Sequence, residues 1–270
     1  MEKAPAAGPP LAVSKTLTFT PKGGRNPTVA MDQRSGAVYL AWAQEVTGPV
    51  DKQHKKTDPV LQVLLARSDD GGRSFGPPVV ANAPEDRVES STVSPTQVAV
   101  GPKGEVYVLY RNHEPAPSGW YTGDGWYSGR TLLRLVRSED GGKSFSPPIE
   151  IGGEAVEGVR STVGMLNLFA APDGDLYASW LDYREQMAYL IAHQKEPPDG
   201  EEPPTHLRVA RSTDGGRSFA KSVLVSKPVC GCCGTKVAQG LSGPLYATTR
   251  GAWQELKGSY DAVRDHFVSV

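Results

Sequence analysis

The chain has 270 residues, enough for one large domain or two small ones with a proper hydrophobic core. Its formal net charge is −1, so nothing in the composition points to nucleic acid or an anionic membrane surface as a partner. No apolar run approaches the roughly 18 residues that a membrane span needs. Thirty Gly and 23 Pro are many for a helical protein, and no segment has a convincing helical period.

The chain begins with an Ala- and Pro-rich stretch, MEKAPAAGPP. Lys3 lies in it, but no apolar segment follows, so it does not have the pattern of a signal peptide. We expect residues 1–23 to form a flexible lead and a first outer strand.

From residue 24 onward, the same order of four short strands is predicted three times. The first strand of each unit is followed by an aromatic strand of period two, a third strand that ends in Arg-Ser, and a short fourth strand. The second strands are AVYLAWA (37–43), EVYVLYR (105–111) and DLYASWL (175–181). The third strands are LQVLLARS (61–68), TLLRLVRS (131–138) and HLRVARS (206–212). A repeat of this kind indicates one supersecondary unit used several times.

Each third strand leads into the same octapeptide turn: SDDGGRSF at 68–75, SEDGGKSF at 138–145 and STDGGRSF at 212–219. The aspartates can accept hydrogen bonds from N–H groups of their own turn, and the second glycine can take a positive φ. The closing phenylalanine is expected to pack on a neighbouring strand or sheet. A calcium loop is the weaker alternative, because too few carboxylates converge. The structural positions are Ser68, Asp70, Gly72, Phe75, Ser138, Asp140, Gly142, Phe145, Ser212, Asp214, Gly216 and Phe219.

One four-stranded sheet cannot bury both of its faces alone, whereas radial stacking of several sheets can. The sequence therefore predicts an all-β fold, a β-propeller of four-stranded antiparallel blades. The expected blades are residues 24–83, 90–153 and 160–227, with a partial fourth at 228–270. We expect an incomplete propeller, either truncated or completed by self-association through its open edge.

The pattern S-x-D-x-G-x-x-F resembles the Asp box, or BNR repeat, of sialidase-like propellers, and the resemblance covers the chain from about Gly24 onward. It implies the fold more strongly than an activity, because many Asp-box propellers are not sialidases. Relatives of this kind usually have six or more blades and are commonly exported. The resemblance thus implies a periplasmic or secreted protein.

The long insertions fall on the connection from strand two to strand three, on the edge opposite the Asp boxes, as expected of a binding face. They are residues 46–58, 113–129, 185–204 and 251–263. In the second insertion, Trp120 and Trp126 could stack on sugar rings or fold back as local packing. The same edge receives candidate ligand-binding residues from the strand ends: Arg25, Arg111, His113, Asp182, Arg184 and Arg250. Converging arginines can hold a carboxylate, although salt bridges between blades explain them equally well.

Sialidases hold a carboxylate with three arginines, and Arg25 in R-x-P resembles the first of them. By the same resemblance, Asp51 is the candidate acid/base, with Asp58 as a competitor in the same loop. The D-x-R of the family stands at residues 182–184 rather than at 43–45, and a nucleophile is not found. We therefore expect a protein that binds a carbohydrate or small anionic ligand. The alternative is a sialidase-type glycoside hydrolase completed by further blades.

All three cysteines lie in one turn, CGCC, as Cys230, Cys232 and Cys233. Cys230 and Cys233 form a C-x-x-C pair that could close as a disulfide. Three thiolates on one turn also suit Cu(I), whereas zinc would need a fourth ligand, for which His266 is a candidate. A metal site for copper or zinc, or a redox site, is thus a third hypothesis.

Overall fold

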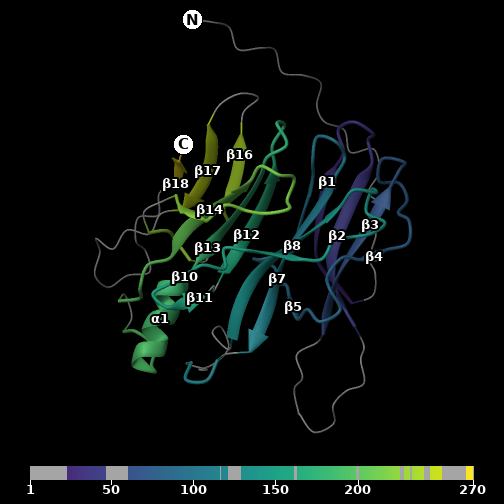
Figure 1. Cartoon of the computed structure of the whole chain (residues 1–270). Coiled ribbons are helices and arrows are strands. Elements are labelled where there is room, and N and C mark those ends of the chain that lie inside the picture. Colours follow the sequence, from purple (N-terminus) through teal and green to yellow (C-terminus); the bar gives the residue numbers. More distant parts are fainter. Residues whose placement is uncertain are drawn as a thin grey trace, which may run out of the picture.

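The computed structural model describes residues 23–46, 60–115, 117–120, 129–160, 163–198, 201–225, 228–231, 233–239, 244–250 and 266–269, the last of these as backbone only. The described strands form four larger antiparallel sheets that follow one another along the chain, and one two-stranded hairpin (Figure 1). The expected all-β, antiparallel fold is confirmed.

The first two sheets come from residues 24–151. Sheet 1 consists of β1 (Gly24–Met31), β2 (Val38–Glu45), β3 (Leu61–Ser68) and β4 (Val79–Val80), in that order. Sheet 2 consists of β5 (Val88–Glu89), β6 (Gln97–Val100), β7 (Val106–Pro115), β8 (Gly129–Ser138) and β9 (Ile149–Ile151). In sheet 2, β5 and β6 both pair with β7.

The second half of the chain adds a small hairpin and two more sheets. The hairpin is β10 (Ala155–Val156) with β11 (Val159–Arg160). Sheet 3 consists of β12 (Val163–Ala170), β13 (Leu176–Asp182), β14 (His206–Ser212) and β15 (Val223–Leu224). Sheet 4 consists of β16 (Lys236–Gln239), β17 (Leu245–Arg250) and β18 (His266–Ser269).

One expectation about secondary structure was wrong: an α-helix, α1 (Arg184–His193), follows β13. Only Arg184, Met187 and Leu190 of this helix are buried, spaced three residues apart. So narrow a buried line leaves little apolar periodicity in the sequence. No helix in the described ranges is long and apolar enough to cross a membrane.

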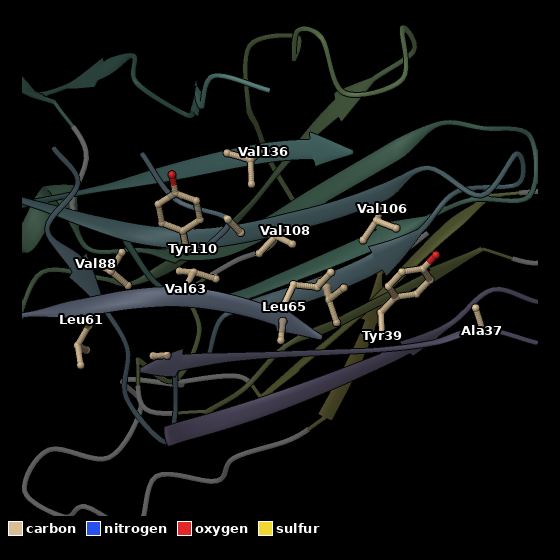
Figure 2. Packing of buried hydrophobic residues seen from close by; sticks show 14 residues of the cluster. Ala37, Tyr39, Leu61, Val63, Leu65, Val88, Val106, Val108, Tyr110 and Val136 are labelled. Atoms are coloured by element: carbon tan, nitrogen blue, oxygen red, sulfur yellow. The ribbon is translucent and has the colours of Figure 1, made fainter. Parts of the chain in front are cut away.

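The middle strands of sheets 2 and 3 are buried on both faces. In β7, Val106, Val108 and Tyr110 pack toward sheet 1, while Tyr107 and Leu109 pack toward sheet 3. Figure 2 shows the first of these interfaces, where side chains of β2 and β3 meet those of β5, β7 and β8. A third apolar cluster joins sheet 3 to sheet 4, with Tyr177 on one side and Val237 on the other. Each sheet therefore covers an apolar face of the next sheet along the chain.

The first strands lie next to one another, with β6 between β1 and β12, and β16 beside β12. The sheets are thus in contact through their faces and also through this line of first strands, which we call the inner strands.

The three octapeptide turns have one hydrogen-bond pattern. Their aspartates accept from backbone N–H groups of their own turn, as expected, whereas the bonds of the first serine were not predicted. In the first turn, Ser68 Oγ donates to Asp70 Oδ1 at 2.7 Å and accepts from Gly72 N at 2.8 Å. Asp70 then accepts from Ser74 N at 2.9 Å and from Ser74 Oγ at 2.6 Å. The turns at 138–145 and 212–219 repeat these bonds. Their second glycines have φ values of 84°, 86° and 74°, also as expected.

The second and third turns also fasten neighbouring sheets. Phe145 packs on the cluster between sheets 1 and 2, and Phe219 packs on the cluster between sheets 2 and 3. A Cβ at Gly142 would lie 2.6 Å from Leu65 of the preceding sheet. The turn of one sheet is therefore pressed against the sheet before it.

Candidate ligand-binding site

The second strands of all four sheets end at the edge opposite the Asp-box turns. Ser68, Ser138 and Ser212 pair with the first residues of β2, β7 and β13, so the turns lie where these strands begin. The opposite edge receives the ends of β2, β7, β13 and β17, and the start of β1 (Figure 1). We call this second edge the strand-end edge.

At the start of β1, a bulge positions Arg25. The register of β1 against β2 shifts between Arg25 and Thr28, and Asn26 there has a φ of 51°. Bulges of this kind re-aim side chains at sheet edges. Arg25 Nη2 lies 2.6 Å from Glu45 Oε2, with both side chains partly exposed. Asn26 Nδ2 donates to Ser90 Oγ at 3.0 Å, which links this corner to sheet 2.

The end of β7 carries a compact polar cluster built around Glu89 of β5. Arg111 Nη1 lies 3.7 Å from Glu89 Oε2, and His113 Nδ1 lies 3.3 Å from Glu89 Oε1. Thr131 of β8 donates to Glu89 Oε2 at 3.0 Å. Burial acts to raise the pKa of Glu89, but His113, Arg111 and Thr131 outweigh it and hold that pKa below its ordinary value. Glu89 is therefore held as a carboxylate.

Arg111 is mostly buried, and its guanidinium has few partners among the described residues. Its side chain is 17% exposed, and its only ion pair among the described residues is the long one to Glu89. Nothing in the described ranges accepts a hydrogen bond from its buried Nε. Burial lowers the pKa of the Arg111 guanidinium, while Glu89 and Tyr183 oppose that shift. A buried guanidinium whose Nε has no acceptor among the described residues suits an anion that approaches from outside.

Asp182 and Arg184, predicted to bind ligand, are instead part of the interior. Arg184 is fully buried, and it holds Asp182 through Nε at 2.8 Å and Nη2 at 2.7 Å. Its Nη1 donates to the carbonyl oxygens of Gly152 and Glu154. Arg208 approaches Asp182 from β14 at 2.5 Å. Because this guanidinium has no exposed surface and its donors are used, it fastens the start of α1 to the end of sheet 2.

Tyr183, the residue between them, joins the Arg111 cluster to the cysteine turn. Its hydroxyl donates to the carbonyl oxygen of Gly231. Its ring packs closely on β12, because a Cβ at Gly164 would lie 2.9 Å from it. The Tyr183 phenol also acts to raise the pKa of Arg111, against the effect of burial. The Tyr183 side chain thus connects β12 of sheet 3 to the cysteine turn.

The cysteine turn lies at the same edge, between sheets 3 and 4. Cys230 Sγ and Cys233 Sγ are 3.0 Å apart, and Arg250 Nη1 is 3.6 Å from Cys233 Sγ. Cys230 is buried and Cys233 is half-buried. In the described part of the chain, no three His, Cys, Asp or Glu residues gather as metal ligands do. Cys232 lies outside those residues, so the three-thiolate hypothesis stays a prediction.

A hollow beside α1 gives the edge an aromatic surface. Tyr189 and His193 stack with ring centroids 4.0 Å apart, and Glu157 and Glu185 line the same hollow. The backbone around Trp120 reaches the end of this helix, where Gln194 Nε2 donates to Gly119 O at 3.0 Å. Trp120 itself is half-buried.

Several predictions fall outside the described residues. These are the lead before residue 23, Asp51, Asp58 and Trp126, and most of the first, second and fourth insertions. Of the predicted site residues that are described, Arg25, Arg111, His113 and Arg250 all lie at the strand-end edge.

Two functional candidates were missed by sequence reasoning, Glu89 and Tyr183. Glu89 directly precedes the sequence SSTV at 90–93, and its STV recurs at 161–163. This repeated connector was the available signal that the segment has a fixed place in the fold. Tyr183 stood inside the D-x-R pattern as its unspecified residue.

Comparison with known proteins agrees with this architecture. No family model and no curated protein sequence matches the chain. Among solved structures, it is similar to a Hadza microbial sialidase, with a TM-score of 0.54 at 17% identity over 85% of this chain and 42% of that one. The NanB sialidase of Streptococcus pneumoniae has a TM-score of 0.54 at 12% identity, over 96% of this chain and 52% of that one. A Dyadobacter fermentans protein of unknown function has a TM-score of 0.53 at 16% identity, over 84% and 57%.

These likenesses define the fold of the chain as sialidase-like. The chain spans about half the length of the structures that it matches.

Proposed function

We propose that the protein binds a glycan or another small anionic ligand at the strand-end edge, with Arg111 as the principal contact. The observation that carries this proposal is the contrast between two buried arginines. Arg184 has its donors paired within the protein, whereas Arg111 has one long ion pair and an Nε with no acceptor among the described residues. Buried polar groups are normally satisfied, so an unsatisfied guanidinium at an edge favours an external acceptor.

The arrangement that we infer for the whole sheet array is a propeller, with the four sheets as successive blades. Its support is the packing of each sheet on the next and the line of inner strands. In a propeller, the strand-end edge becomes the rim around the axis, and residues from different blades can reach one ligand.

The sialidase-like neighbours support an anionic ligand. The NanB structure at a TM-score of 0.54 contains an ethanesulfonate compound, and this is a property of that protein. For this chain, the stacked rings of Tyr189 and His193 offer a flat surface for a sugar ring in the hollow beside α1, which Arg111 does not line.

The test is a calorimetric titration with sialyllactose and with lactose, which lacks the carboxylate. We expect the wild-type protein to prefer sialyllactose, and Arg111→Gln to weaken its binding about 10- to 100-fold, because a hydrogen bond to a charged group contributes roughly 1.5–3 kcal/mol. Binding of lactose should change little. Arg73→Gln, which removes an exposed arginine at the Asp-box edge, is the matched control and should leave both affinities unchanged.

If Arg111→Gln and Arg73→Gln bind sialyllactose equally well, the proposed site is wrong. The alternative function is a sialidase-type hydrolase, for which Arg25 of the R-x-P pattern lies at the same edge. It requires turnover of a fluorogenic sialoside that is lost in Asp51→Ala. Binding without turnover supports the ligand-binding proposal.

A further inference from the structure

The cysteine turn carries a second proposal, which does not depend on ligand binding at Arg111. The two sulfurs of Cys230 and Cys233 are 3.0 Å apart, about 1 Å more than a disulfide bond.

The backbone of this turn is held on several sides. Cys230 N donates to Arg250 O at 2.8 Å, and Val229 N donates to Thr205 O at 2.8 Å. Cys233 N lies 3.4 Å from Cys230 O, and Tyr183 donates to the Gly231 carbonyl. A Cβ at Gly231 would lie 3.0 Å from Thr205 Oγ1, so the turn is packed tightly against sheet 3. Because its backbone is fixed by sheets 3 and 4, the two sulfurs stay within reach of each other.

The surroundings of the pair favour thiol chemistry over metal binding. The guanidinium of Arg250 lies 3.6 Å from Cys233 Sγ. A fixed cation at that distance repels a second cation such as zinc or Cu(I), but it counters the negative charge of a thiolate.

We propose that Cys230 and Cys233 form a reversible redox pair that exchanges with disulfide-containing substrates, with Cys233 as the attacking sulfur and Cys230 as the resolving one. Cys233 is half-buried and lies beside Arg250, whereas Cys230 is 7% exposed. An external disulfide can therefore reach Cys233 first.

The exchange is balanced in two steps. The Cys233 thiolate attacks one sulfur of the substrate disulfide, and the other sulfur leaves as a thiolate that takes a proton. Cys230 then loses its proton, and its sulfur attacks Cys233 Sγ and expels the second substrate thiol. The protein gives up two electrons and two protons, and one disulfide becomes two thiols.

The experiment uses the full chain, prepared anaerobically and equilibrated in buffers of reduced and oxidised glutathione. Remaining thiols are alkylated, peptides are mapped by mass spectrometry, and metal content is measured on the same sample. We expect a two-electron transition to a Cys230–Cys233 disulfide, with Cys232 still alkylated. Cys232→Ser is the matched control and should keep the transition at the same potential.

Trapping the mixed disulfide assigns the roles. With oxidised glutathione, Cys230→Ser should accumulate glutathione on Cys233. In Cys233→Ser, glutathione should add to Cys230 at least about tenfold more slowly than it adds to Cys233 in Cys230→Ser, because the Cys230 sulfur is buried. Arg250→Gln should slow the attack on glutathione, and Arg250→Lys should restore most of the rate.

Three results would overturn the proposal. A disulfide that includes Cys232 would show a different pair, and faster trapping at Cys230 would reverse the roles. About one metal ion per chain, with the thiols protected from alkylation, would establish the metal site instead. Because the wild-type titration needs no substitution, a variant that fails to fold leaves the pairing testable.

Discussion

In the repeated turns, a serine hydroxyl and an aspartate carboxylate take the place of water as partners of backbone N–H groups. The hydrogen bond from the Ser74 hydroxyl is the largest effect on Asp70, and it holds the pKa of that carboxyl well below its ordinary value. Ser144 and Ser218 do the same for Asp140 and Asp214. The carboxylates, not the carboxylic acids, are therefore the structural form.

The stability of the protein should depend on pH through these three groups. Their pKa values are lower in the folded than in the unfolded protein, so their contribution is complete above about pH 4 to 5 and is lost as pH falls. We expect the free energy of unfolding to decrease steadily from pH 5 to pH 2.5. Asp70→Asn should make that dependence shallower and should lower stability at neutral pH. Urea unfolding at several pH values measures both.

Glu201→Gln, which removes one exposed carboxylate outside the turns, is the control. If its pH dependence and that of Asp70→Asn are the same, the hydrogen bonds of the turn do not set the acid stability.

These turns were predictable from sequence because their chemistry is local. Ser, Asp and Gly at fixed spacing satisfy one another within eight residues. The roles of Arg184 and Arg111 were not predictable, since both are basic residues near the end of a second strand. Only the packing shows that Arg184 binds Asp182 and interior carbonyl oxygens, whereas Arg111 has a long ion pair to Glu89.

At the scale of elements, the hydrogen bonds of Arg184 fix the position of the start of α1 after sheet 3. It joins the end of β13 to the segment after β9, which belongs to sheet 2. The strands of period two were predictable, whereas α1 and the short β10–β11 hairpin lack a clear pattern of their own. Their positions come from long-range contacts such as this one.

Substitution of Arg184 should therefore be costly. Arg184→Gln leaves the buried Asp182 with Arg208 alone, and loss of one partner from a buried ion pair costs about 3–5 kcal/mol. Arg160→Gln removes an exposed arginine that binds Glu150 with two contacts of 2.8 Å, and an exposed pair contributes about 0–1 kcal/mol. Urea unfolding of the two variants gives the comparison. Equal losses would show that Arg184 does not fasten α1 to sheet 2.

At the scale of the molecule, cohesion comes from sheets that are apolar on both faces. All seven residues of β13 are buried, with Leu176, Ala178 and Trp180 toward sheet 2 and Tyr177 and Leu181 toward sheet 4. Repeated second strands of aromatic and apolar residues made stacked sheets predictable. Which residue faces which neighbour depends on register, and the bulge between Gly164 and Asn167 in β12 gave no sequence signal.

The interface between sheets 2 and 3 has a sharp test at Gly152, which follows β9. A Cβ there would lie 2.4 Å from Cζ2 of Trp180, and Gly152 has a φ of 69°. Gly152→Ala combines a backbone cost of about 1–2 kcal/mol with overpacking of about 1–3 kcal/mol. Gly158→Ala provides the control, because Gly158 has a φ of 79° and no atom within 4 Å of the added Cβ. Gly152→Ala should thus lose clearly more stability in urea unfolding and should shift the fluorescence of Trp180. If the two variants lose the same amount, only backbone strain matters at Gly152, and Trp180 does not lock the two sheets together.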